Sequence, residues 1–251
     1  MKYREGNPAG NTTNIIMDTR AGSAARLLLK QMNDALFPLG AFSHSYGLET
    51  YIQKGLVSDV EGAASFLRPW IGYNFLYGDL FCAALAWNCG KNRDAAALAK
   101  LEEIARASKG PRELREAAHK IGSRFARTLL NLLPLTEFDA SFPGDCFLGE
   151  KGPPSHACAY GVVAGCLGID REDAMEAFLY TQVSAMVTCC VKTIPLSQTA
   201  GQALLTGLFG LMKTTLARLD TLETSGLYRG CPGFDLRSME HETLYSRLYM
   251  S

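Results

Sequence analysis

Apolar residues recur at steps of three and four along most of the chain, which is the pattern of helices that bury one face. The clearest case spans residues 111–133, where charged residues lie off a single apolar stripe. No strand alternation of useful length occurs, so the expected fold is all-α, a single helical-bundle-like domain of roughly ten helices. The stripe consists of Leu114, Ala118, Ile121, Phe125, Leu129 and Leu132, and the other expected helices are 24–37, 60–75, 79–88, 94–107, 155–167, 170–193, 195–222 and a short one near the end.

Proline, glycine and polar residues mark the expected boundaries of this domain. Residues 1–22 lack apolar periodicity and are predicted to be a mobile N-terminal tail. The helical domain is expected at 23–229, with residues 139–154, rich in proline and glycine, as one long loop inside it. The expected helix starts are Ser155, Asp170 and the capping box Ser58-Asp59-Val60-Glu61.

Residues 230–251 are predicted to be a C-terminal tail that binds a partner. Leu244, Tyr245, Leu248 and Tyr249 would lie on one apolar face of a helix, and such a face can fold on binding. The alternative is that the same residues pack on their own domain. Both termini are expected to be weakly ordered without a partner.

Composition excludes some classes of function. Lys and Arg together number 25, as do Asp and Glu, so a protein that binds nucleic acid through its phosphates is disfavoured. The eight cysteines include no CxxC pair, and the first ten residues carry charges and Pro8 where a signal peptide would be apolar. We therefore expect a cytoplasmic protein with reduced, mostly buried thiols.

Residues 177–212 contain a single charge, Lys192, which raises the question of a membrane segment. Polar residues interrupt the stretch, so no run of about 18 near-continuous apolar residues survives and a membrane protein is not expected. The better interpretation is two helices buried in the core or in a subunit interface. Because stable interfaces are more apolar than ordinary surface, we expect a homodimer built on helices from 155–222.

Known catalytic motifs are missing from the sequence. It has no P-loop, no nucleophile elbow and no HExxH, so neither intrinsic hydrolase or GTPase activity nor a cofactor is expected. Ser43 and His44 could form a nucleophile and base in a small all-α enzyme, but adjacent residues rarely point the same way. The other interpretation is a capped helix start.

The histidines and helical glycines also favour structural roles. No two histidines have the spacing of a zinc site, so no tight metal site is expected, although a weak or intersubunit site for a borderline metal such as nickel stays open. Gly161, Gly165 and Gly168 lie in a helical pattern without a preceding strand. They are predicted to allow close helix packing rather than to form a dinucleotide-binding turn.

Five blocks of sequence together resemble the urease accessory protein UreF family. They occur in the family's order and span residues 37–251, and the first and last are long and specific. The blocks are Phe37-Pro38-Leu39-Gly40-Ala41-Phe42-Ser43-His44-Ser45-Tyr46-Gly47-Leu48-Glu49; Glu113-Leu114-Arg115 with Gly122; His156 with Tyr160-Gly161-Val162; Cys190-Val191-Lys192 with Pro195-Leu196-Ser197-Gln198; and 241–251.

The resemblance implies an all-α, dimeric, non-catalytic factor for urease maturation. Such proteins bind UreD (also called UreH), and the pair recruits the GTPase UreG to apo-urease, where nickel enters and a lysine is carbamylated. GTP chemistry would belong to UreG, whose activity this chain would modulate. The residues expected to contact partners are Ser43, His44, Tyr46, Glu49, Lys192, Gln198, Leu244, Tyr245, Arg247, Leu248 and Tyr249.

Lys192 has two explanations that the sequence leaves open. It is expected near a helix end before Pro195, where a cation stabilises the helix dipole. Alternatively, it is a charge in an apolar rim that meets a carboxylate of UreG or urease.

Overall fold

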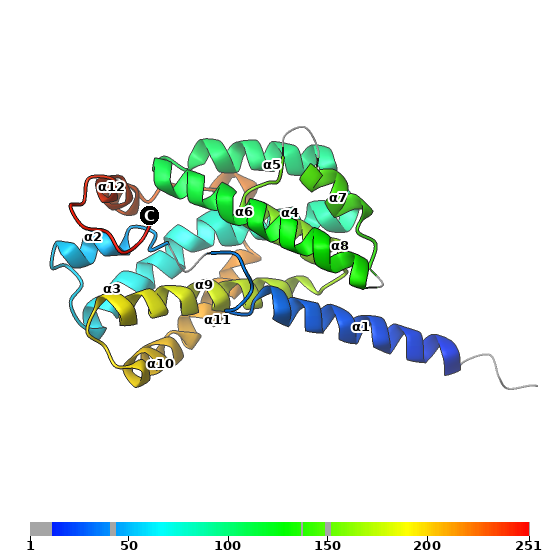
Figure 1. The fold of residues 1–251 in the computed structure, drawn as a ribbon, viewed down its shortest axis with the longest axis horizontal. Helices are drawn as coiled ribbons and strands as arrows, with labels where there is room; N and C mark the ends of the chain where they lie inside the picture. The colour runs from blue at the N-terminus through cyan, green and yellow to red at the C-terminus, as the bar shows by residue number, and fades with distance from the viewer. Residues whose placement is uncertain (1–11, 41–43, 137, 149–151, 251) are drawn as a thin grey trace, which may run out of the picture.

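The computed structural model describes residues 12–40, 44–136, 138–148 and 152–250, with side chains from residue 22 onward. These residues form helices and no strand, which confirms the all-α fold (Figure 1). In chain order the helices are α1 (Thr12–Met32), α2 (Leu48–Gln53), α3 (Val60–Pro69), the π-helix η2 (Trp70–Leu80), α4 (Phe81–Asn92), α5 (Ala95–Ser108), α6 (Arg112–Leu132), the short η3 (Leu133–Leu135), α7 (Ser141–Leu148), α8 (His156–Cys166), α9 (Arg171–Thr193), α10 (Gln198–Gly207), α11 (Phe209–Leu219), the short η4 (Thr224–Gly226) and α12 (Pro232–His241).

Helices α4 and α8 form the centre of the fold, and glycines bring their backbones together. A Cβ added to Gly161 of α8 would overlap the carbonyl oxygen of Ala83 in α4, and one added to Gly90 of α4 would overlap that of Val162. Gly165 makes the same kind of approach to α4. The prediction of close packing is thus confirmed for Gly161 and Gly165, whereas Gly168 has a positive φ just beyond the end of α8.

The long helical run that starts at α3 changes its hydrogen bonding where it crosses the core. Eleven residues, Trp70–Leu80, are π-helical, and Gly78 has a non-helical backbone. Such π segments are rare and often lie at functional sites. The run begins at Asp59, whose side chain accepts the Gly62 amide, so the expected capping box with Ser58 as its first residue is wrong.

Two stretches that the sequence predicted to be non-helical contain helix in the structure. Helix α7 lies inside the predicted loop 139–154, because Phe142 and Phe147 are buried and Pro143 stands in the first turn, where proline is tolerated. Helix α1 begins at Thr12 rather than at Ala24, so the backbone of residues 12–22 is helical. The predicted tail was inferred from missing apolar periodicity, which does not prevent a helix at the edge of a domain; residues 1–11 lie outside the described part.

The apolar stretch with one charge forms α9, α10 and α11. The helix expected at 195–222 is divided at Leu208, and Asp170 caps α9 as predicted by accepting the amides of Glu172 and Asp173. Within the described residues, α9 is the one helix long and apolar enough to cross a membrane. Because 56% of its apolar window is buried inside the protein, α9 has the environment of a core helix.

Candidate functional site: the anchor of the C-terminal segment

The first sequence block ends in a tight turn beneath α12. Tyr46 and Gly47 both have positive φ, 51° and 84°, and the turn leads directly into α2. A Cβ on Gly47 would lie 2.5 Å from Oγ of Ser238, so only glycine fits under α12 here. Figure 1 shows α2, α12 and the C-terminus at the same end of the molecule.

Glu49, on the first turn of α2, holds the C-terminal segment by its backbone. This carboxylate is 3% exposed and accepts the amide of Leu248 at 2.7 Å and that of Tyr249 at 3.1 Å. Its Oε2 also lies 3.1 Å from Nε2 of His241. All three of these contacts join Glu49 to residues 241–249.

His241 is fully buried between two carboxylates from different helices. Its Nδ1 lies 2.6 Å from Oε2 of Glu113 on α6, and Arg247 donates to the other oxygen of Glu113 at 2.7 Å. Each ring nitrogen therefore lies within hydrogen-bond distance of a carboxylate oxygen, and His241 bridges Glu49 and Glu113. Arg247 supplies a positive charge at Glu113, and two backbone amides donate to Glu49, so both carboxylates have the partners that burial requires. We call Glu49, Glu113, His241 and Arg247 the anchor.

Tyr249 and Cys189 lie next to the anchor, on the side facing α9. Tyr249 is buried, and burial raises the pKa of the Cys189 thiol to about 11. That thiol points at the carbonyl oxygen of His44 at 3.7 Å. Burial, reinforced by Lys120 and Arg124, lowers the pKa of His44 to about 4.

This environment argues against the Ser43/His44 enzyme. A histidine with a pKa near 4 is a poor general base at neutral pH, because efficient bases titrate near the working pH. Ser43 lies outside the described residues. The partly buried Tyr46 side chain packs toward the ring of Trp70, with centroids 6.4 Å apart.

The C-terminal segment differs from the expected single apolar face. Residues after His241 are not helical, so Leu244, Tyr245, Leu248 and Tyr249 do not share one side. Tyr245 and Leu248 are exposed, Leu244 is half-buried and Tyr249 is buried. Backbone capture by Glu49 decides this arrangement, and the alternative of packing on its own domain describes the segment better.

Lys192 and Gln198 are six positions apart, at the end of α9 and the start of α10, and neither belongs to the anchor. Lys192 is exposed in the last turn of α9, and Gln198 is the exposed first residue of α10. The Pro195 turn between them separates the two helices. Position alone is consistent with both explanations of Lys192.

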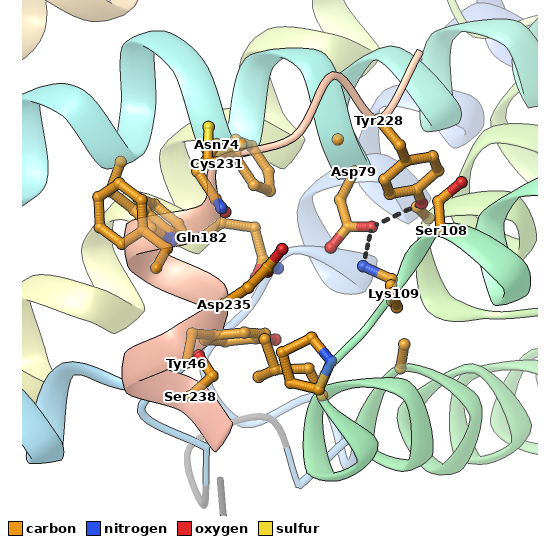
Figure 2. Close-up of a pocket in the computed structure, with 18 of the residues that line it drawn as sticks. Tyr46, Asn74, Asp79, Ser108, Lys109, Gln182, Tyr228, Cys231, Asp235 and Ser238 are labelled. Atoms are coloured by element: carbon orange, nitrogen blue, oxygen red, sulfur yellow. Dashed lines mark hydrogen bonds and ion pairs between the residues drawn. The ribbon is translucent and has the colours of Figure 1, made fainter. Parts of the chain in front are cut away.

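A cavity of about 90 Å³ lies beside the anchor, between α12 and the π-helix (Figure 2). Asp79 pairs with Lys109 at 2.7 Å and accepts the Tyr228 hydroxyl at 3.1 Å, as the dashed lines in Figure 2 show. Burial opposes ionisation of Asp79, but Lys109 and Tyr228 outweigh it and lower its pKa. Ser238 lines the cavity with a buried hydroxyl that has no hydrogen-bond partner among the described residues.

The described residues hold no group of three or more His, Cys, Asp or Glu side chains suited to a metal ion. Sequence pattern did not single out Glu113 and His241 as site residues, although both stand in blocks that carried the resemblance. It also missed Asp79, Lys109 and Tyr228, for which no motif gave a signal. Asp79 contacts Lys109 and Tyr228, which are far from it in the chain, so a local sequence pattern does not reveal the group.

Comparison with known proteins identifies the family of this chain. The UreF family model matches residues 57–209, more than half of the chain. The chain belongs to the UreF family. It is 32% identical over 229 residues to a urease accessory protein UreF of Bacillus sp. (strain TB-90), covering 90% of this chain and 98% of the relative. It is 30% identical over 235 residues to a UreF of Arthrobacter sp. (strain FB24), covering 92% and 99%.

The anchor residues of this UreF-family chain come from three of the five sequence blocks. Glu49 ends the first block, Glu113 opens the second, and His241 and Arg247 belong to the last. The fold brings these three blocks into contact at one end of the molecule. The third and fourth blocks lie in α8 and around the end of α9.

Proposed function

We propose that this UreF-family chain is a non-catalytic adaptor in the cytoplasm that acts with UreD to recruit the GTPase UreG to apo-urease. Nickel is the cargo of this assembly, and a urease lysine is carbamylated in the same process. The chain itself acts as a homodimer and modulates GTP hydrolysis by UreG. Family membership and the curated names of its relatives support the role in urease maturation.

One observation supports a docking surface: the anchor fixes the backbone of the C-terminal segment while apolar side chains of that segment stay exposed. Glu49 fixes the backbone at residues 248 and 249, while the Tyr245 and Leu248 side chains are 106% and 75% exposed. Leu236 on α12 and Met250 add exposed apolar surface from the same part of the chain. An apolar surface on a fixed backbone binds with a smaller entropic cost than a disordered tail. We assign UreD to this surface.

The test is a Tyr245→Ala/Leu248→Ala double variant. We expect the Kd for UreD to rise by about tenfold or more, because aromatic anchors contribute a large share of binding energy. The melting temperature should stay within about 1–2 °C, because surface substitutions change stability little. Isothermal titration calorimetry and thermal melting measure the two quantities.

A matched control is Leu36→Ala/Leu135→Ala, which removes two equally exposed leucines elsewhere, 91% and 82% exposed. It should bind UreD as the wild type does. Unchanged UreD affinity in the Tyr245/Leu248 variant would refute this surface. Point substitutions are preferable to deleting residues 232–251, since deletion would strip His241 from Glu49 and Glu113.

Lys192 is proposed to face UreG, on the rim at the end of α9. Replacing it in Lys192→Ala should lower UreG capture by the UreD complex about threefold to tenfold and weaken its salt dependence, as loss of a rim charge does. Lys213→Ala, an exposed lysine on α11, is the control. If Lys192 only stabilises the helix end, capture will be unchanged and the melting temperature will fall slightly.

A further inference from the structure

Two thiols meet in the centre of the fold. Sγ of Cys82 on α4 lies 3.4 Å from Sγ of Cys158 on α8, and both residues are fully buried. They are separated by 76 positions in the chain. Neither thiol takes part in the anchor or in the proposed docking surface.

The packing of α4 on α8 brings the thiols of the two cysteines into contact. Ala83, the neighbour of Cys82, approaches Gly161 so closely that no Cβ fits between the helices, and Gly161 is one turn from Cys158. A disulfide needs neighbouring backbones and Cβ atoms that face each other. The contact between the Sγ atoms shows that the two side chains point toward each other, and bond formation has to shorten their separation of 3.4 Å to about 2.05 Å.

We propose that Cys82 and Cys158 are an oxidisable dithiol that forms an intramolecular disulfide in the native fold. The oxidant class is a small hydroperoxide. One thiol is oxidised to a sulfenic acid, releasing one water. The second sulfur then displaces the hydroxyl group, forming the S–S bond and a second water. In sum, two thiols and one hydrogen peroxide give one disulfide and two waters.

Burial sets the rate of this reaction and protects its product. The hydrogen bond to Cys82, together with burial, raises the pKa of the Cys158 thiol, so little reactive thiolate is present. Oxidation is therefore slower than at the half-buried Cys146 or Cys231. The neighbouring thiol intercepts the sulfenic acid before further oxidation, and the buried bond then resists bulky thiol reductants.

Tyr228 connects this pair of cysteines to the cavity beside the anchor. The Cys82 thiol lies beside the Tyr228 hydroxyl, and that hydroxyl donates to Asp79 at 3.1 Å. Figure 2 shows Tyr228 and Asp79 together on one wall. Disulfide formation removes the S–H of Cys82, and with it the hydrogen bond between Cys82 and Tyr228.

The experiment treats the native full-length chain with hydrogen peroxide, quenches with catalase, and measures the intact mass after alkylation in denaturant. In a Cys146→Ser/Cys231→Ser background, which removes the two half-buried thiols that oxidise faster, the expected product has lost two hydrogens and contains two fewer alkylated cysteines. Trypsin leaves Cys82 with Cys89 on one peptide and Cys158 with Cys166 on another, so mapping alone does not identify the pair. The Cys89→Ser/Cys166→Ser variant should keep the cross-linked peptides, whereas Cys82→Ser and Cys158→Ser should lose them.

A second measurement distinguishes a bond in the native fold from one formed on unfolding. The oxidised protein should melt roughly 5–10 °C higher than the reduced protein, because the bond restricts a long loop of the unfolded chain. Reduction with a small phosphine should restore the original value. Absence of the cross-link, its persistence in Cys82→Ser, or a melting temperature lowered by oxidation would each overturn the proposal.

Discussion

Replacing Gly161 by alanine is expected to lower the free energy of unfolding by about 2–4 kcal/mol, which corresponds to a fall in melting temperature of roughly 5–15 °C. The added Cβ would overlap the carbonyl oxygen of Ala83 and lie 2.8 Å from Cβ of Ala86. Relief requires α4 and α8 to separate, and these helices form the centre of the fold. The higher helix propensity of alanine, about 1 kcal/mol, offsets only part of this cost. Differential scanning calorimetry measures the change.

Gly210→Ala is the matched control for this prediction. Gly210 is also a helical glycine, near the start of α11, but nothing lies within 4 Å of the Cβ that alanine would add. Alanine should therefore stabilise the protein there by up to about 1 kcal/mol. If Gly161→Ala and Gly210→Ala had the same melting temperature, close approach of the backbones would not explain why position 161 needs glycine.

Glu49→Ala is expected to release the C-terminal segment. The substitution leaves Nε2 of His241 and the amides of Leu248 and Tyr249 without their acceptor. A buried hydrogen-bonding group left without its partner costs about 1–3 kcal/mol, because it keeps the penalty of leaving water. Detachment of residues 242–250 limits that cost, so we expect a loss of about 2–3 kcal/mol in unfolding free energy.

The local signature of this release is hydrogen exchange. Amides of Leu248 and Tyr249 should exchange at least about a hundredfold faster in Glu49→Ala, while amides in α4 and α8 keep most of their protection. Glu116→Ala is the control, since Glu116 is an exposed glutamate on α6 whose salt bridge among the described residues is with Lys120 at 3.5 Å. Unchanged exchange at residues 248 and 249 would contradict the anchor. UreD affinity should fall along with the protection if the anchor displays the docking surface.

Local pattern identified the helices well because their burial is periodic. The stripe of α6 is buried at Ile121, Phe125 and Leu129, at the spacing that the sequence shows. Asp170 and Asp94 cap the helices that follow them, since a carboxylate accepts amides of the first turn wherever it occurs. The same local rules failed at α7, where prolines and glycines predicted a loop but two phenylalanines bury their side chains.

The functional residues divide in the same way. The sequence blocks identified the family and placed Glu49, Arg247 and Tyr249 among the partner-contacting residues. They did not show that Tyr249 faces inward while Tyr245 faces outward, because that depends on where Glu49 meets the backbone of the segment. A helical spacing rule assumed a helix that residues 242–250 do not form.

The sequence by itself determined an all-α chain of the UreF family, with glycines suited to close helix packing and no known catalytic motif. Only the tertiary structure decided that Glu49, Glu113 and His241 share one buried site, and that Cys82 meets Cys158. The physical reason is that helical periodicity specifies which face of each helix is buried, but not which other helix covers it. The contacts between His241 and its two carboxylates span 192 and 128 positions, and helix crossings far from either residue set them.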